Sequence, residues 1–134
     1  MADTVTSDVT YNTDDVYGLH LTGVSDGTGE TNVIKVDKSA MTIKGQSPAV
    51  AVGHMAIERV RGFQNGYTYI KLHWDHTTDD TAVLLGSGQF DLDFREHPLH
   101  DPQSAGGTGD LLLSTVGHTA GDVYDIHLDM RFYK

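Results

Sequence analysis

The densest group of side chains able to do chemistry lies in residues 73–80, with the sequence HWDHTTDD. Imidazole and carboxylate groups are the ligands of many metal sites. His73 and Asp75 would share one face of a strand, with His76 and two further aspartates in the following turn. The spacing matches neither an EF-hand loop nor the helical two-histidine zinc motif. We therefore favour solvent-facing strand residues followed by a polar turn, and we predict neither a metal site nor a cofactor.

A second group of histidines lies in residues 95–109, the longest stretch without a hydrophobic period. Long loops in compact domains are often functional. No nucleophile or partner base accompanies these histidines, so we expect no catalysis there. We interpret the loop either as a flexible excursion or as an arm that becomes ordered on a partner. The candidate contact residues in it are His97, Leu99, His100 and Asp101.

The other motif-like patterns favour structure over chemistry. The glycine-rich segments 25–30 and 106–110 lack the lysine of a phosphate-binding loop and have too few spaced carboxylates for a calcium loop, which favours hairpin turns. Asp91 and Asp93 could mimic a glycosidase pair, but they alternate with apolar residues and so indicate a solvated strand face. Trp74 falls in phase with its apolar neighbours and is expected in the core. We predict no catalytic residues, and hence no enzyme.

The elements that position these groups are predicted to be strands. Residues 122–134 alternate without a break between apolar and polar side chains, which is typical of a half-buried strand lying within a sheet. Residues 32–38 predict another strand, with Ile34 and Val36 facing the core. Asn65-Gly66 is a strong hairpin signal. We also expect residues 111–116 and 123–133 to pair as a final hairpin.

Eight or nine short strands without a clear helix indicate an all-β fold. We predict an antiparallel β-sandwich, for which jelly-roll connections are one option, in a single domain of residues 14–134. A small closed barrel is the alternative. Residues 1–13 are rich in Thr, Ser and Asp and are expected to form an N-terminal arm or an edge strand.

Composition narrows the classes of partner. The 134 residues include no cysteine, and 19 acidic against 9 basic residues give a formal net charge of −10. Such a charge disfavours nucleic acid and anionic membrane surfaces, so we predict neither as a partner. The first residues lack the features of a signal peptide, and no apolar run approaches the ~18 residues that span a bilayer. The absence of cysteine fits synthesis in a reducing cytoplasm.

Three segments together resemble small virion structural proteins of tailed bacteriophages. They are SDGTGETNVIKVDKS at 25–39, LHWDHTTDDTAVLLGSG at 72–88, and GGTGDLLLSTVG at 106–117 followed by AGDVYDIHL at 120–128. These are strand-and-turn patterns that cover about two thirds of the chain, and none of them is an active-site motif.

The resemblance implies a non-enzymatic virion component made in the host cytoplasm. Within that group we expect a capsid decoration (cement) protein, which binds the outside of the major capsid protein lattice and stabilises it. The N-terminal residues Thr4, Val5 and Thr6, together with the 95–109 loop, are the candidate contacts. By analogy alone we expect a homo-oligomer, with a trimer as the guess.

Two other functions stay open at this point. One is a tail, neck or fibre-associated virion protein. The other is a carbohydrate-binding module for host attachment, which exposed aromatic side chains on one sheet face would favour. The candidates for that face are Tyr67, Tyr69 and Tyr133.

Overall fold

A computed structural model describes residues 4–13, 15–43 and 50–134. These residues form twelve strands and one short 3-10 helix, η1 (Lys38–Ala40). The strands are β1 (Thr4–Thr13), β2 (Val16–Val24), β3 (Val33–Val36), β4 (Thr42–Ile43), β5 (Val50–Ala51), β6 (His54–Asn65), β7 (Tyr69–Trp74), β8 (Asp80–Leu85), β9 (Gly88–Asp93), β10 (Leu99–His100), β11 (Leu111–Val116) and β12 (Val123–Tyr133). The predicted all-β class is confirmed.

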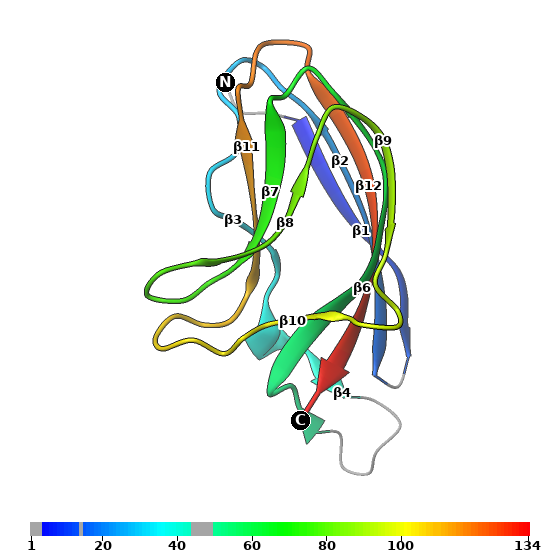
Figure 1. Cartoon of the computed structure of the whole chain (residues 1–134), viewed down its shortest axis with the longest axis vertical. Helices are drawn as coiled ribbons and strands as arrows, with labels where there is room; N and C mark the ends of the chain where they lie inside the picture. Colours follow the sequence, from blue (N-terminus) through cyan, green and yellow to red (C-terminus); the bar gives the residue numbers. More distant parts are fainter. Residues whose placement is uncertain (1–3, 14, 44–49) are drawn as a thin grey trace.

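Two antiparallel sheets face each other (Figure 1). The larger sheet has the order β1-β2-β12-β6, with β9 and β10 both pairing with β6. The smaller sheet has the order β3-β11-β7-β8, and β4 pairs with β5 separately. Apart from β1 and the shortest strands, the first strand, β2, lies beside the last, β12, and successive strands alternate between the sheets except at the β7–β8 hairpin. This wrapping order is that of a jelly roll, and it excludes the barrel alternative.

The core lies between the sheets and follows the predicted alternation. Along β12 every second side chain is buried, and the buried set runs from Tyr124 to Phe132. Trp74 is 1% exposed and belongs to this core, as expected. Asp91 and Asp93 are exposed on β9, while Phe90 and Leu92 pack against the core. No helix in the described part of the chain is long and apolar enough to cross a membrane.

The predicted hairpins at four turns are wrong. The segments around Asn65-Gly66, 25–30, 106–110 and 117–122 each connect a strand of one sheet to a strand of the other. A turn sequence fixes local backbone direction, but the sheet that the next strand joins depends on distant partners. Gly66, for example, has the positive φ of 105° that its turn signal predicts, yet β6 and β7 belong to different sheets.

The expected inward orientation of Ile34 is also wrong, because this side chain is 54% exposed. The register of β3 against β11 passes from Val36 opposite Leu111 to Ile34 opposite Leu112, so Lys35 is an extra, bulged residue. A bulge reverses the phase of the residues before it. Lys35 thereby turns inward, where its Nζ lies 2.7 Å from Glu30 Oε1 with both side chains buried.

Candidate functional site

The most unusual surface of the molecule is the edge of the larger sheet formed by β1, on the side that faces away from β2. We call β1 and this side of it the open edge. Within the described residues, β1 pairs only with β2. Its burial pattern is exposed along nearly all of its ten residues. An edge strand presents unpaired backbone N–H and C=O groups, which can pair with another chain. The sequence candidates Thr4, Val5 and Thr6 lie at the beginning of this strand.

The open edge has an apolar inner face. Val5 lies opposite Gly23 and Val9 opposite Leu19, and Leu19 points into the core. Val5 and Val9 therefore extend the core-facing side of the sheet, yet they are 41% and 53% exposed. The apolar inner surface of the larger sheet thus continues beyond the part that the sandwich buries.

Side chains hold β1 in place on the outer face of the sheet. The hydroxyl groups of Thr6 and Thr22 are hydrogen-bonded across the two strands. Near the other end of β1, Tyr11 donates from its hydroxyl to Asp129 Oδ1 at 2.7 Å. Burial and the hydrogen bond to Asp129 raise the pKa of Tyr11. Its ring covers Gly18, where a Cβ would lie 2.2 Å from the ring.

The structure does not bring the two groups of candidate contact residues together. Directly opposite residues on β1, β2, β12 and β6 form rows across the larger sheet, and the row that starts at Thr4 ends at Asn65 of β6. His100 lies opposite Ala56 of the same strand. Those two positions are nine residues apart on β6, which is about 30 Å along a strand. A partner contacting both groups would have to cover the length of the sandwich.

Within the 95–109 loop, the candidate residues differ in their exposure. His97 and His100 are exposed, Leu99 is half-buried, and Asp101 is 3% exposed. The Asp101 Oδ1 atom lies 2.6 Å from Nε2 of the buried His76. Burial opposes the charged form of His76, but hydrogen bonds with Asp101 and the Gly106 carbonyl outweigh it, so the pKa of His76 is raised. Asp101 therefore holds the loop against the β7–β8 turn.

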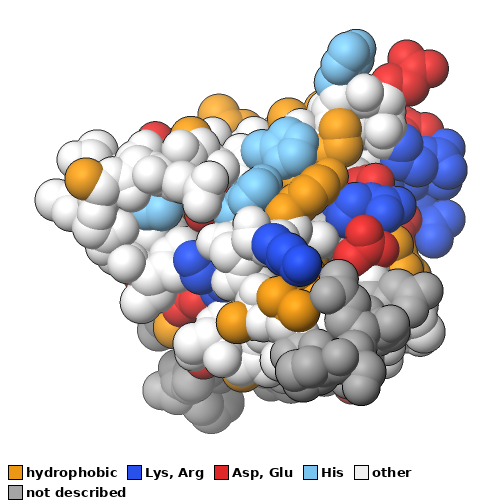
Figure 2. Space-filling view, turned by 90° about the horizontal axis from the view of Figure 1, so that it is seen from below, with side chains coloured by type: hydrophobic (Ala, Val, Ile, Leu, Met, Phe, Trp, Pro, Cys, Tyr) orange, Lys and Arg blue, Asp and Glu red, His pale blue; other side chains and the backbone are white. Residues whose placement is uncertain are grey.

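His100 also takes part in a ring cluster at the end of the sandwich where β10 and the end of β12 meet (Figure 1). The rings of His54 and Tyr133 stack with centroids 4.8 Å apart, and His100 packs against both. Figure 2 looks onto this end and shows histidine side chains gathered beside hydrophobic ones. Burial, and then the nearby His100, lower the pKa of His54.

The solvent-facing interpretation of His73 is wrong, because its side chain is fully buried. Nδ1 of His73 lies 3.0 Å from Asp79 Oδ2, and Nε2 lies 3.0 Å from Ser114 Oγ. This is the order of groups in a serine-nucleophile triad. However, Ser114 is 7% exposed, and its Oγ already accepts a hydrogen bond from the backbone N–H of Asn32 at 2.8 Å. The arrangement ties the residue before β3 to β11 and β7, so we interpret it as structural.

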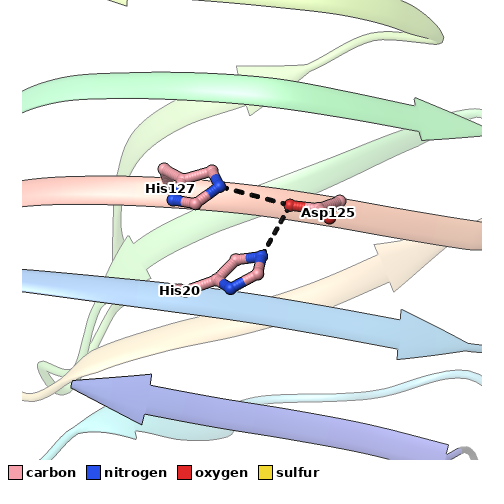
Figure 3. Close-up of side chains that lie close together, drawn as sticks. All are labelled: His20, Asp125 and His127. Carbon is pink, nitrogen blue, oxygen red and sulfur yellow. Dashed lines mark hydrogen bonds and ion pairs between the residues drawn. The ribbon is translucent and has the colours of Figure 1, made fainter. Parts of the chain in front are cut away.

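A third histidine group, which the sequence reasoning missed, lies on the outer face of the larger sheet (Figure 3). His20 of β2 stands directly opposite His127 of β12. Both rings approach Asp125, which lies two residues before His127 on the same face. The alternation of residues 122–134 placed Asp125 and His127 on one polar face, but only the register of β2 against β12 adds His20.

No family profile matches the chain, and no curated protein or solved structure is significantly similar to it.

Proposed function

We propose that the protein is a non-enzymatic virion structural protein of a tailed bacteriophage, and that it is a capsid decoration protein which binds the outside of the major capsid protein lattice. The observation that carries the proposal is the open edge. A ten-residue strand, exposed on both faces and carrying few charges, is hazardous for a free protein unless a partner covers it.

The mode of contact that we propose is strand addition. A strand of the capsid protein would hydrogen-bond along β1, and its apolar side chains would cover Val5 and Val9. Many weak contacts of this kind, repeated over a lattice, become strong through multivalency. The rigid jelly roll supplies a fixed scaffold, and the net charge of −10 disfavours binding to the packaged DNA.

The carbohydrate-binding alternative has less support. Of its three candidate aromatics, Tyr67 is 2% exposed, and its hydroxyl donates a hydrogen bond to the Asp122 carbonyl at 3.4 Å. Tyr133 is stacked on His54. A sugar-binding face needs flat aromatic rings open to solvent, and these two rings are occupied by neighbours.

The test is co-sedimentation of the purified protein with expanded and unexpanded capsids that lack it. We expect saturable binding to expanded capsids, with a stoichiometry that matches the lattice. Removal of residues 2–13 should abolish this binding while the far-UV circular dichroism of the sandwich is kept. Equal binding by the truncated and full-length chains would contradict the role of the open edge, and binding to neither capsid form would contradict the proposed function.

A finer variant tests the edge without removing it. Val5→Lys with Val9→Lys places two charges on the open edge, and we expect at least about tenfold weaker capsid binding. The matched control is Ser87→Lys with Gln89→Lys, which adds the same charge at exposed positions near β9. Sedimentation velocity of the free protein completes the test. If the first variant dissociates an oligomer while capsid binding is unchanged, the edge is occupied by a second copy of this chain.

A further inference from the structure

The His20, Asp125 and His127 group has the geometry of a small metal site. The two imidazole rings stack with centroids 4.1 Å apart and planes inclined by 6°. Nε2 of His20 lies 2.8 Å from Asp125 Oδ1, and Nε2 of His127 lies 3.6 Å from the same oxygen. One nitrogen from each histidine and one carboxylate oxygen therefore all lie within 4.8 Å of one another. Figure 3 shows both rings directed at this oxygen.

The backbone fixes this arrangement. His20 and His127 are direct cross-strand partners in the middle of the larger sheet, with β1 outside β2 and β6 outside β12. Asp125 comes from the same strand as His127, two residues earlier, so the pleat places both on one face. Two ligands on one strand and one on its neighbour keep their spacing whatever the loops do. All three side chains are half-buried, which limits their rotation and leaves an approach from solvent.

We propose that His20, Asp125 and His127 bind a divalent transition-metal ion of the zinc type. Two neutral imidazole nitrogens and one carboxylate oxygen are a ligand set that zinc accepts, with metal–ligand distances of about 2.0–2.2 Å. Small rotations of the three side chains would bring the donor atoms to these distances. Binding would replace the hydrogen bond between His20 and Asp125, because each Nε2 would need its lone pair for the metal. A neutral imidazole meets this requirement by carrying its proton on Nδ1 instead.

The neighbouring residues of the same cross-strand row affect the strength of the site. Asp8 of β1 stands opposite His20, and Arg61 of β6 stands opposite His127. Cross-strand partners have Cβ atoms about 4.5–5.5 Å apart, so the Asp8 carboxylate adds negative charge close to the site. Arg61 opposes a cation by its charge. We expect Asp8→Asn to weaken binding and Arg61→Gln to strengthen it.

The experiment is titration of the full-length, tag-free protein with zinc chloride in a non-coordinating buffer near neutral pH, followed by calorimetry and by the imidazole nitrogen signals in NMR. We expect one ion per chain and perturbation of the His20 and His127 signals. His127→Gln and Asp125→Asn should each weaken binding at least about tenfold. The matched control is His54→Gln, which removes a histidine from the other ring cluster and should leave the affinity unchanged.

Three outcomes would overturn the proposal. One is the absence of any zinc-dependent heat or NMR shift in the wild-type chain. Another is unchanged affinity in His127→Gln, with the folded state checked by circular dichroism. The last is loss of affinity in His54→Gln, which would place the ion at the His54 and His100 cluster. These readouts are made on the free protein, so they are independent of the capsid-binding test.

Discussion

The two edges of the larger sheet are built in opposite ways. At one edge stands β1, which is ten residues long, and its exposed side chains include Val5 and Val9. At the other edge stand β9 and β10, which are six and two residues long; we call this the short-strand edge. Short, charged edge strands discourage pairing with other chains, whereas long uncharged ones invite it.

Charges are concentrated at the short-strand edge. Arg59 pairs with Asp91 through two hydrogen bonds of 2.9 and 2.7 Å, and Arg95 pairs with Asp93. Hydrogen bonds from the side chain and backbone of Arg95 hold the pKa of Asp93 at about 2. The comparison shows that the short-strand edge is protected against association and the open edge is not. For this reason we propose that a partner binds at β1.

The largest effect is expected at Gly62, where the backbones of β6 and β12 lie very close together. A Cβ at Gly62 of β6 would lie 1.9 Å from the backbone oxygen of Asp125, and Gly62 has a φ of 142°. Gly62→Ala should therefore lower the free energy of unfolding by about 3 kcal/mol or more, because the β12 backbone must move.

Gly18→Ala is the matched substitution at the open edge. There the Cβ would meet the Tyr11 ring, a side chain that can swing away. We expect β1 to exchange its amide hydrogens faster while the global free energy of unfolding changes by much less than in Gly62→Ala. Denaturant unfolding with hydrogen exchange measures both. If both variants lose the same amount of global unfolding free energy, β1 contributes as much to the stability of the sandwich as β12 does.

A second prediction concerns the loop that follows the short-strand edge. Asp101→Asn removes the carboxylate partner of the buried His76 and should cost about 1–3 kcal/mol of unfolding free energy. Because the pKa of His76 is raised in the folded state, this stabilisation is fully present below the ordinary histidine pKa of about 6.5 and is lost as pH rises through the folded value. The variant should therefore differ most from wild type near pH 5.5 and least near pH 8.5, in urea unfolding at both values. If the unfolding free energies of the variant and the wild type differ equally at both pH values, His76 and Asp101 do not form a charged pair.

The third prediction tests what fastens the open edge. Tyr11→Phe loses the hydrogen bond to Asp129 at a partly exposed site, so we expect a loss of about 1 kcal/mol or less in the local stability of β1. Amide exchange along Thr4–Thr13 is the measurement. Unchanged exchange would mean that the backbone pairing with β2 alone holds the strand.

The smallest effect is expected at the exposed ion pairs of the short-strand edge. Arg95→Ala should not measurably change the thermal unfolding midpoint, because such exposed pairs contribute little to stability. It should instead raise the apparent pKa of Asp93 towards the ordinary value, which carboxyl NMR titration measures. An unchanged pKa would mean that Arg95 does not pair with Asp93 in solution.

The sequence predicted the strands better than their partners. Alternation is a local property, so the strand of residues 122–134 and the burial of Trp74 were readable from the chain. The sheet to which a strand belongs depends on distant residues, which is why the hairpin predicted at Asn65-Gly66 is wrong. The bulge at Lys35 was hidden for the same reason, since it exists only relative to β11.

The candidate sites show the same division. The exposure of His97 agrees with its place in a loop, but His100 belongs to the short strand β10, and the hydrogen bonds of His73 to Asp79 and Ser114 join different segments of the chain. His20 approaches Asp125 and His127 only because of the register between β2 and β12, and the spacing of residues along the sequence does not predict that register. The proposal of a capsid partner rests on resemblance and on the open edge, and the co-sedimentation experiment is its test.

The position of β12 between β2 and β6 also has a consequence for how fast the protein can fold. His20 and Asp125 touch although they are 105 residues apart in the chain. As the chain leaves the ribosome, β2 and β6 each lack their shared neighbour until β12 has been made. Pairing over such separations is slow because the entropy of closing the loop is lost before contacts form. The apolar sides of β2 and β6 are therefore exposed during synthesis, and we expect yield to depend more on temperature and chaperones than the stability of the finished sandwich would suggest.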